Sequence, residues 1–547
     1  MVRPQPRDFL AGLSVAGLIL PEGVAYAQIA GLAPGRALIA AIAGGLAYVA
    51  AGRSRFAILS PTSSSAAILA AALGSMALPL NAPVDTRDMM ATALTLIVGV
   101  LFLGLAAFRL GSLAGFISRP VLRGFALGLA LTIVIRQLPR IVGVSLPASS
   151  IGGVLAGLAT SLPQWHPACL ALGLAALALL LGLRRVRGVS AALVVLVGGI
   201  ALAFAVDLSA LGIGLAGPAP LLMPTLALPT GLSTWARLAQ LAAPITLIIF
   251  AESWGTMRSL ALREGDALSS NRELGAIGLA NCAAALAHGM PVGAGFSAGQ
   301  ANASAGAVSR VAALTAALAL LGLALFAEPL IARIPEPVLA AVVIGALTHA
   351  LSPDPLLRLF RTGRDQWVGL AAALGVLGLG VLNGMLLAIG LSIAELLYRL
   401  SHPSVSELGR VGRSHDFVDI ARHDDARALP DLAIFRPNAP LFFANAEEAL
   451  KAIADQVRAR AARTLVLSLE QSSDFDSTAA EALGEFARTL EAMRCRLILA
   501  RAHDRVRDVL VASGMAALAE NSTYSVADAV ARAHNHTVPH PHATTET

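Results

Sequence analysis

The chain has 547 residues, of which 56% are hydrophobic and 14% charged, and its formal net charge is +6. Soluble domains carry about 25% charged residues, so this composition excludes a single ordinary soluble protein. The charges are unevenly spread: residues 1–400 hold 14 acids and 24 bases, whereas residues 401–547 hold 20 acids and 16 bases. We therefore predict a membrane domain over residues 1–400 and a smaller soluble domain after it.

The positive charge comes almost entirely from arginines, because Lys451 is the single lysine. The arginines lie singly or in small groups between apolar runs, which is typical of loops at the ends of membrane helices. Nucleic-acid binding would need a basic face with interleaved aromatic residues, so no nucleic-acid partner is expected. Cys169, Cys282 and Cys495 lie far apart and form no zinc motif, and no Walker loop is present. Neither a metal nor a cofactor is expected.

A membrane-spanning helix needs about 20 mostly apolar residues. Fourteen runs of suitable composition follow one another in the first part of the chain. They centre on residues 9–28, 37–52, 62–77, 89–108, 121–138, 167–184, 189–206, 241–260, 274–288, 297–306, 310–330, 336–350, 366–382 and 383–400. If all of them cross and the N-terminus is cytoplasmic, seventeen of the arginines between them face the cytoplasm and six face the other side. This distribution follows the positive-inside rule and predicts that both termini are cytoplasmic, in an inner or plasma membrane.

The runs 62–77 and 297–306 are short and rich in small residues, and each is the third run in a set of seven. Short segments interrupted by Gly or Pro at matching places in two halves indicate an inverted-repeat transporter. The N-termini of such half-helices direct free N–H groups at a shared site and favour an anion. Hydroxyl groups that can add donors there belong to Thr62, Ser63, Ser64 and Ser297. The alternative is that the small residues only permit tight helix packing.

Two acidic residues lie inside predicted spans, one in the first run of each half. Glu22 follows Pro21, which can break the helix at midspan, and Glu252 lies in the eighth run. An ionisable group inside a membrane is a functional candidate, and a carboxyl group in a low dielectric favours its neutral form and can carry a proton. We hypothesise that at least one of the two couples proton movement to anion movement. The alternative for each is a structural carboxyl group hydrogen-bonded between helices.

Four passages of the membrane part resemble the SulP family of anion permeases. They are residues 20–27, 52–55, 270–281 and 295–306. The resemblance implies fourteen helices in a seven-plus-seven inverted repeat, divided into core and gate subdomains, and a homodimer in the lipid bilayer. It implies a substrate between the starts of the third and tenth helices. It also places Tyr26, Phe296 and Ser297 on substrate positions and Glu252 on an acidic position linked to ion coupling.

Two residues depart from the family pattern. Glu22 stands where the family has Gln, and Ala298 stands where many relatives have Arg. No fixed cation is therefore expected beside Ser297, and Glu22 is expected to be protonated or turned away, because an ionised carboxylate would repel an anion. The resemblance implies a secondary active transporter that works by alternating access. Its substrate would be sulfate, bicarbonate or a dicarboxylate such as fumarate, with a proton, or sodium, as the coupling ion.

The soluble part begins with a polar segment, residues 401–429, which is predicted to be a linker. Residues 430–533 then alternate between strand and helix patterns, which favours a small sheet with helices packed on it. The predicted strands are 433–436, 440–444, 464–469 and 496–500, and the predicted helices are 446–460, 477–492 and 504–513. Residues 534–547 carry four histidines and are predicted to be a disordered tail rather than a metal site.

Residues 439–446 and 474–478 resemble STAS domains, which are attached to SulP permeases and are shared with anti-sigma-factor antagonists. Ser477 falls on the position that is phosphorylated in the antagonists, so a regulatory role is one hypothesis. The alternative is that Asp476 or Ser477 only caps the helix that follows.

The same sequence also allows two alternative functions. A membrane sensor could use the STAS domain as its output, and a nucleobase-type transporter could share the fold, although the attached STAS domain argues against that transporter. An enzyme is not expected, because the membrane part shows no Ser/His or Cys/His pairing and no metal-spaced cluster.

Overall fold

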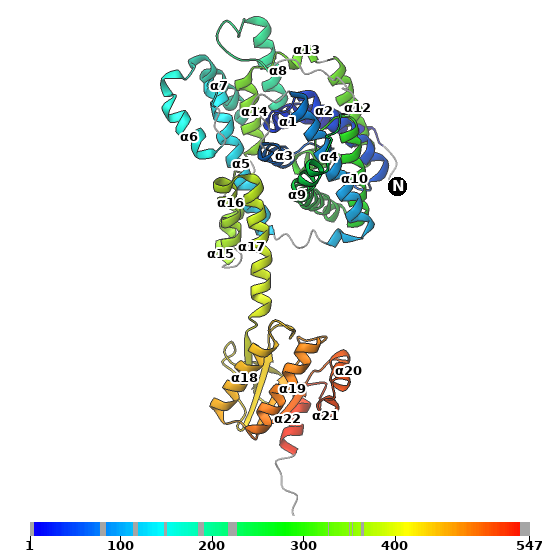
Figure 1. The fold of residues 1–547 in the computed structure, drawn as a ribbon, viewed down its shortest axis with the longest axis vertical. Helices are drawn as coiled ribbons and strands as arrows, with labels where there is room; N and C mark the ends of the chain where they lie inside the picture. Colours follow the sequence, from blue (N-terminus) through cyan, green and yellow to red (C-terminus); the bar gives the residue numbers. More distant parts are fainter. Residues whose placement is uncertain are drawn as a thin grey trace, which may run out of the picture. The chain divides into compact units, whose positions relative to one another are not determined.

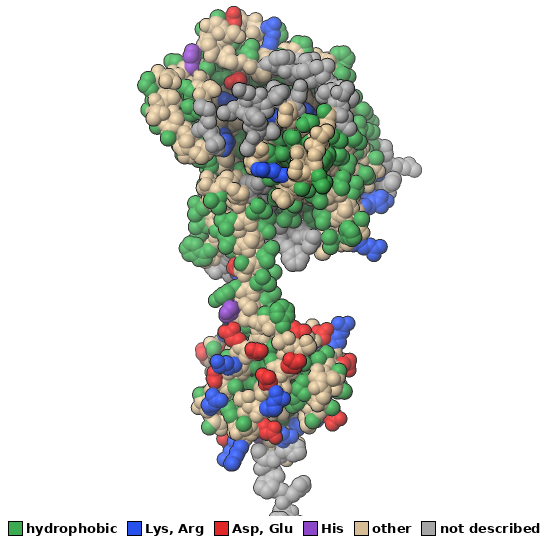
Figure 2. Space-filling view, viewed as in Figure 1, with side chains coloured by type: hydrophobic (Ala, Val, Ile, Leu, Met, Phe, Trp, Pro, Cys, Tyr) green, Lys and Arg blue, Asp and Glu red, His purple; other side chains and the backbone are tan. Residues whose placement is uncertain are grey.

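The computed structural model describes residues 5–76, 84–112, 119–146, 150–183, 191–216, 227–326, 328–348, 351–352, 354–362 and 366–535. The chain divides into two compact units, Met1–Ser392 and Ile393–Thr547 (Figure 1). The division falls close to the point where the density of charged residues rises. In Figure 2 the visible surface of the first unit is mainly hydrophobic, whereas acidic and basic side chains alternate over the second unit.

The first unit is built from helices. In chain order they are α1 (Pro6–Ala30), α2 (Pro34–Ala51), α3 (Ser63–Ser75), α4 (Val84–Ala107), α5 (Arg119–Val142), α6 (Ile151–Thr160), the 3-10 helix η2 (Leu162–Gln164), α7 (Pro167–Leu183), α8 (Ala191–Ala205), α9 (Leu232–Glu264), α10 (Ser270–Leu286), α11 (Phe296–Ser304), α12 (Val311–Phe326), α13 (Glu328–Ile331), α14 (Glu336–Leu347), α15 (Asp354–Thr362), α16 (Gln366–Leu379) and α17 (Val381–Ser401). Each of the fourteen predicted apolar runs overlaps one of these helices. Helices α6 and α15 were not predicted from the sequence, because neither contains the long apolar run that identifies a membrane span.

Five of the described helices, α1, α2, α4, α5 and α9, are long and apolar enough to cross a membrane. Shorter apolar helices of 10–17 residues accompany them, among them α3, α12 and α14. A helix of 13 residues such as α3 extends only about 20 Å at 1.5 Å per residue. This length is too short to cross the hydrocarbon layer, so one end of α3 lies inside that layer. The backbone groups at such a helix end need hydrogen-bond partners from other parts of the protein.

The helices pack as two groups. The first group contains α1 to α4 and α9 to α12, in which α10 packs on α2 and α4, and α1 packs on α2, α3, α11 and α12. The second group contains α5, α7, α8, α14 and α16, in which α5 packs on α7, α14 and α16. Helix α1 also contacts α8 and α14, so it lies at the boundary between the two groups.

Helix α1 runs without interruption from Pro6 to Ala30, with Pro21 inside it. The predicted break at midspan is therefore wrong. Proline removes one helix hydrogen bond, but packed neighbouring helices can support a membrane helix that contains it. Pro21 and Glu22 are buried in the interior of the unit, so Glu22 is presented by a continuous helix rather than by an unwound segment.

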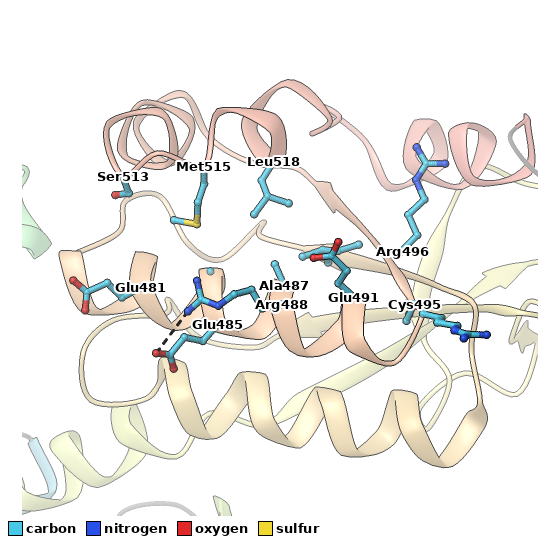
Figure 3. A pocket seen from close by; sticks show the side chains of 13 residues that line it. Glu481, Glu485, Ala487, Arg488, Glu491, Cys495, Arg496, Ser513, Met515 and Leu518 are labelled. Atoms are coloured by element: carbon cyan, nitrogen blue, oxygen red, sulfur yellow. Dashed lines mark ion pairs between the residues drawn. The ribbon is translucent and has the colours of Figure 1, made fainter.

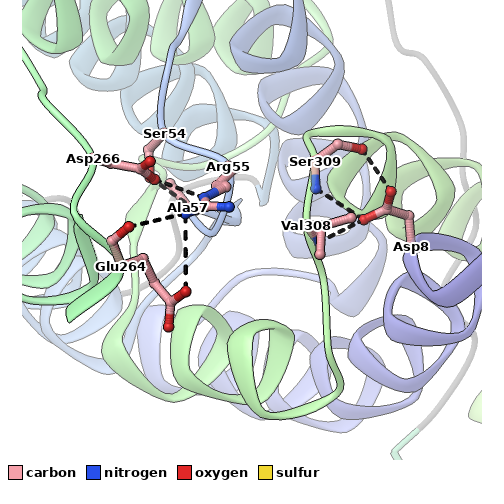
Figure 4. Close-up of polar contacts among 8 residues, drawn as sticks. All are labelled: Asp8, Ser54, Arg55, Ala57, Glu264, Asp266, Val308 and Ser309. Atoms are coloured by element: carbon pink, nitrogen blue, oxygen red, sulfur yellow. Dashed lines mark hydrogen bonds and ion pairs between the residues drawn. The ribbon is translucent and has the colours of Figure 1, made fainter. Parts of the chain in front are cut away.

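Two polar contacts tie the segments between these helices together (Figure 4). Asp8, near the start of α1, accepts hydrogen bonds from the backbone N–H of Val308 at 2.8 Å and of Ser309 at 2.9 Å. Arg55, which follows α2, forms an ion pair with Asp266 after α9 at 2.7 Å. Both contacts join the two halves of the unit.

Two short strands lie inside the first unit, β1 (Leu59–Ser60) and β2 (Gly293–Ala294). The approach to β2 is fixed by Asn281 of α10, whose side chain is fully buried. Its Nδ2 donates to the carbonyl groups of Ile277 at 2.9 Å and Val292 at 3.0 Å, and its Oδ1 accepts from the N–H of Val292 at 3.0 Å. A single amide side chain therefore satisfies both backbone groups of the residue before β2.

The second unit contains a mixed sheet with strand order β4-β3-β6-β7-β8, and β5 pairs with β3. The strands are β3 (Val405–Val411), β4 (Phe417–Asp419), β5 (Ala426–Arg427), β6 (Leu432–Pro437), β7 (Thr464–Ser468) and β8 (Arg496–Ala500). The pairs β6–β7 and β7–β8 are parallel, and β3 is antiparallel to β6. The helices are α18 (Ala446–Arg460), α19 (Ser477–Ala492), α20 (Asp504–Ala512), α21 (Ala516–Glu520) and α22 (Val526–Asn535).

Two predictions for this unit are wrong. Residues 401–429 are not a linker, because β3, β4 and β5 lie there and join the sheet. Residues 440–444 form a turn instead of a strand, because side chains rather than a neighbouring strand bind their backbone. The predicted helices 446–460 and 477–492 are confirmed, and Asp476 is the cap of α19, accepting from the N–H of Ala479 at 2.8 Å.

Helix α22 continues to Asn535, two residues into the segment predicted to be a tail. His534 therefore lies in this helix. His536, His540 and His542 lie outside the described residues.

We expect Asn281→Ala to lower the free energy of unfolding by about 1–3 kcal/mol, because it leaves a buried N–H and a buried carbonyl group without partners. Thermal unfolding of the protein in detergent measures the effect. The matched control is Asn383→Ala in α17, since Asn383 is exposed and its side chain donates to the carbonyl group of Leu379 at the end of α16 at 3.4 Å. Equal shifts for the two variants would contradict this role of Asn281.

Candidate functional site

The starts of α3 and α11 meet at the pair of short strands. Leu59 pairs with Ala294 and Ser60 with Gly293 in antiparallel register, and each strand leads directly into its helix. Thr62 is the residue before the first turn of α3, whose N–H groups its side chain caps, and Gly295 holds the same position before α11. A Cβ atom placed on Gly295 would lie 3.4 Å from Cγ2 of Thr62, so the two helix starts are in van der Waals reach of each other.

Both helix starts carry a partial positive charge from unpaired N–H groups. The side chain of Thr62 accepts a hydrogen bond from the N–H of Ser65 at 3.1 Å, which satisfies part of the start of α3. Gly295 has no side chain with which to cap α11. Two positive helix ends that face each other, one of them uncapped, form an environment suited to an anion.

Two carboxyl groups reach these helix starts from α1 and α9. Thr62 Oγ1 donates to Glu252 Oε2 at 3.3 Å, and Ser64 lies close enough to interact with the same carboxyl group. On the other side, Ser297 interacts with Glu22. Each acid therefore lies beside hydroxyl groups at the start of one of the two helices.

Most of the predicted site residues are thus brought together. Glu22, Tyr26 and Thr62 are all less than 10% exposed, and Tyr26 interacts electrostatically with both Glu22 and Glu252. Phe296 is instead 57% exposed, and Ser297 is exposed as well. Ser63 is half-buried. The start of α11 therefore opens onto accessible space, while the acids lie deeper.

Sequence reasoning missed the residues that hold the strands in place. Ser253, next to Glu252 and buried, accepts a hydrogen bond from the N–H of Ala294 at 2.9 Å. A Cβ atom on Gly293 would lie 2.9 Å from Ser253 Oγ and 3.0 Å from Cγ2 of Ile249, so α9 packs closely against β2. The repeated Gly residues around position 293 were the one available signal of this close approach.

The second unit has a separate hollow of about 830 Å³ beside α19 (Figure 3). Met515 and Leu518 lie among the side chains that line it, together with charged residues of α19 such as Glu485 and Arg488. Ser477 is not among its lining residues. Among the residues that the structure describes, no group of three or more His, Cys, Asp or Glu side chains is placed to hold a metal ion.

Comparison with known proteins accounts for both units. The profile described as Sulfate permease family matches residues 6–368. The chain belongs to the sulfate permease family. The permease also carries a STAS domain, matched over residues 424–529. It is therefore a multi-pass membrane transporter of anions and not an enzyme.

Relatives and solved structures resemble the permease along most of its length. A probable sulfate transporter of Mycobacterium tuberculosis is 33% identical over 514 residues, which cover 93% of this chain and 91% of that protein. Solute carrier family 26 member 6 of Homo sapiens is 28% identical over 80% of this chain and 61% of its own.

Two solved structures share the fold. The murine Slc26a9 anion transporter in the inward-facing state has a TM-score of 0.88 at 20% identity, covering 98% of this chain and 92% of that one. The transmembrane domain of a cyanobacterial bicarbonate transporter, BicA, has a TM-score of 0.62 at 21% identity and covers 71% of this chain and 97% of that one.

We expect Gly293→Ala to reduce the rate of anion uptake strongly, about tenfold or more, because the added Cβ displaces β2 from α9 and separates the two helix starts. Uptake into proteoliposomes measures the rate. Gly255→Ala is the matched control in α9, because a Cβ there meets nothing within 4 Å. Comparable loss in both variants would show that Gly293 has no special position.

Proposed function

We propose that this permease is a proton-coupled secondary transporter of a small oxyanion, with sulfate as the first candidate. The observation that carries the proposal is the meeting of two helix starts, beside which lie the buried carboxyl group of Glu22 and the half-buried carboxyl group of Glu252. The name of the mycobacterial relative, a probable sulfate transporter, supports sulfate. Bicarbonate and a dicarboxylate such as fumarate are the alternatives, and sodium is the alternative coupling ion.

The proposed substrate-binding residues are those that the two helix starts and α1 present to the site. They are Tyr26, Thr62, Ser63, Ser64, Phe296 and Ser297. Ala298 follows Ser297, so the start of α11 supplies hydroxyl and N–H donors but no side-chain cation there. Recognition would rest on helix dipoles and hydroxyl groups, which suits an anion that must be released again on the other side.

Glu252 and Glu22 would link proton binding to anion binding by competing for donors. An ionised Glu252 accepts the hydroxyl hydrogen of Thr62 and so occupies a donor that a bound anion needs. A protonated Glu252 carries no charge and accepts more weakly from that hydroxyl group, which can then donate to the anion. Because protonation removes both the competition and the repulsion, the proton and the anion would each raise the affinity for the other.

The proposal also covers the repeat, the orientation, the oligomeric state and the regulation of the permease. Helices α3 and α11 would be the half-helices of a seven-plus-seven inverted repeat, with the first helix group as core and the second as gate. We propose cytoplasmic termini in an inner membrane, a homodimer, and a regulatory role for Ser477, which is exposed at the first position of α19. The abundance of arginines on the predicted cytoplasmic side supports the orientation.

We expect Glu252→Gln to abolish the stimulation of sulfate uptake by an inwardly directed proton gradient, because the amide neither binds nor releases a proton. Glu22→Gln, which restores the family residue, should retain at least part of that stimulation. The measurement is uptake of labelled sulfate, bicarbonate and fumarate into proteoliposomes, with proton and sodium gradients applied separately.

Three outcomes would contradict the proposal. Full stimulation by the gradient in Glu252→Gln would remove Glu252 from the coupling. Stimulation by sodium alone would replace the proton as coupling ion. Anion binding without flux in the wild-type permease would favour the sensor function instead.

Alternating access requires that contacts between the two helix groups break. One such contact joins Gln28 of α1 to Arg140 of α5, whose Nη1 donates to Gln28 Oε1 at 2.9 Å. Arg140 also lies 3.5 Å from Gln137 Oε1 and forms no ion pair with a carboxylate of the described chain. The guanidinium group is thus held by neutral amide groups. Hydrogen bonds to these groups break more easily during a helix movement than an ion pair with a buried carboxylate would.

We expect a short thiol-specific cross-link between Gln28→Cys and Arg140→Cys, in a background without the native cysteines, to stop uptake until it is reduced. A cross-link between Ser75→Cys and Arg237→Cys is the control, because Arg237 bonds to the carbonyl group of Ser75 within the first group. Unchanged uptake in the cross-linked Gln28/Arg140 pair would show that this contact need not open.

A further inference from the structure

Within the second unit, the end of α17 is capped by a side chain of the STAS domain. Asn445 Nδ2 donates to the carbonyl oxygen of Leu400 at 2.7 Å, and Asn445 is only 1% exposed. The last four carbonyl groups of a helix have no partner within the helix. Asn445 therefore fixes the end of α17, and the part of α17 from Ile393 onward belongs to the second unit.

The same asparagine organises the turn that replaces the predicted strand. This turn, residues 440–445, is called the capping turn below. Asn445 Nδ2 also donates to the carbonyl oxygen of Pro440 at 2.9 Å, and its Oδ1 accepts from the N–H of Phe442 at 2.9 Å. The side chain of Asn445 can therefore hold Leu400 only while the capping turn keeps its shape.

The capping turn is held from its other side by the segment that starts α19. Asp476 Oδ2 accepts a hydrogen bond from the N–H of Phe443 at 2.8 Å, while its Oδ1 accepts from the N–H of Ala479 at 2.8 Å. One carboxylate thus caps α19 and anchors the capping turn. Ser472 Oγ adds a bond to the N–H of Leu441 at 3.0 Å.

A continuous set of hydrogen bonds therefore runs from the start of α19 to the end of α17. We propose that Asp476 and Asn445 are positioning residues that transmit the state of the α19 start to the end of the last membrane helix. The input is the charge at Ser477, so this inference rests on the regulatory role proposed for Ser477. The output is the order of the last turn of α17.

The direction of the effect follows from electrostatics. A protein kinase would transfer the γ-phosphoryl group of a nucleoside triphosphate to Ser477 Oγ, with release of the nucleoside diphosphate and the hydroxyl proton. The phosphoryl group brings about two negative charges and three strong acceptors to the start of α19, where the free N–H groups favour an anion. It competes with Asp476 for the N–H groups of α19 and repels its carboxylate. Displacement of Asp476 releases Phe443, the capping turn loosens, and Asn445 loses the geometry that holds Leu400.

The test uses the full-length permease and two nearly isosteric variants. Asn445→Asp replaces the donor to Leu400 by an acceptor but keeps the acceptor for Phe442. Ser477→Asp adds a negative charge beside Asp476. The matched controls are Asn438→Asp, whose Nδ2 bonds only to Ser404 and Ser406 among the described residues, and Ser525→Asp, which adds the same charge at the cap of α22.

Hydrogen exchange followed by mass spectrometry reports the order of residues 396–402 and 440–446. We expect about fivefold faster exchange in residues 396–402 for Asn445→Asp, the effect expected for one lost buried hydrogen bond. Ser477→Asp should speed exchange in both segments, and both variants should change the maximal uptake rate without changing the KM for the anion. The two controls should leave exchange and uptake unchanged.

Unchanged exchange at residues 396–402 in Asn445→Asp would overturn the inference, and so would Ser477→Asp if it altered neither segment. Hydrogen exchange is measured without a transported anion, so it tests this inference separately from the proposed function. If the wild-type permease showed no coupled uptake, the proposed function would fail, and the exchange data would still decide this inference.

Discussion

The structure of the membrane unit depends on one constraint, that backbone polar groups inside a bilayer must find partners within the protein. The segments before α3 and α11 are not helical, so their N–H and carbonyl groups lack the bonds that a helix supplies. They satisfy one another through the pairing of Ser60 with Gly293, and the side chains of Asn281 and Ser253 satisfy the neighbouring groups. The position of the two helix starts is a result of this requirement.

The site and the coupling that we propose follow from the same arrangement. Helix starts that are fixed in this way present positive dipole ends, and the adjacent Thr62 and Ser297 supply hydroxyl groups. The two acids on α1 and α9 lie beside these hydroxyl groups, because Glu252 accepts from Thr62 and Glu22 interacts with Ser297. The groups that would recognise the substrate are the groups that hold the coupling acids.

The members of the proposed site could be selected from the sequence because such residues are rare in a membrane segment. Carboxyl groups and runs of hydroxyl residues between apolar helices are conspicuous, as at Glu252. It could not predict contacts between side chains far apart in the chain, such as Arg140 with Gln28, because both residues look like ordinary polar residues near helix ends. The capping turn was not predicted for a related reason. Its apolar residues have a strand pattern, and the turn depends on hydrogen bonds from the buried Asn445 and the half-buried Asp476.

The pairing of β1 with β2 also has a consequence for biogenesis. Ser60 is synthesised long before Gly293, so while the intervening helices are being made the start of α3 has neither its strand partner nor the facing helix start. Closing so long a loop costs chain entropy, and the two halves can be held together at this point only after both have been inserted. The proposed site therefore cannot form before α11 has been made, and a chain interrupted before α11 would contain the helices of the first half without this site.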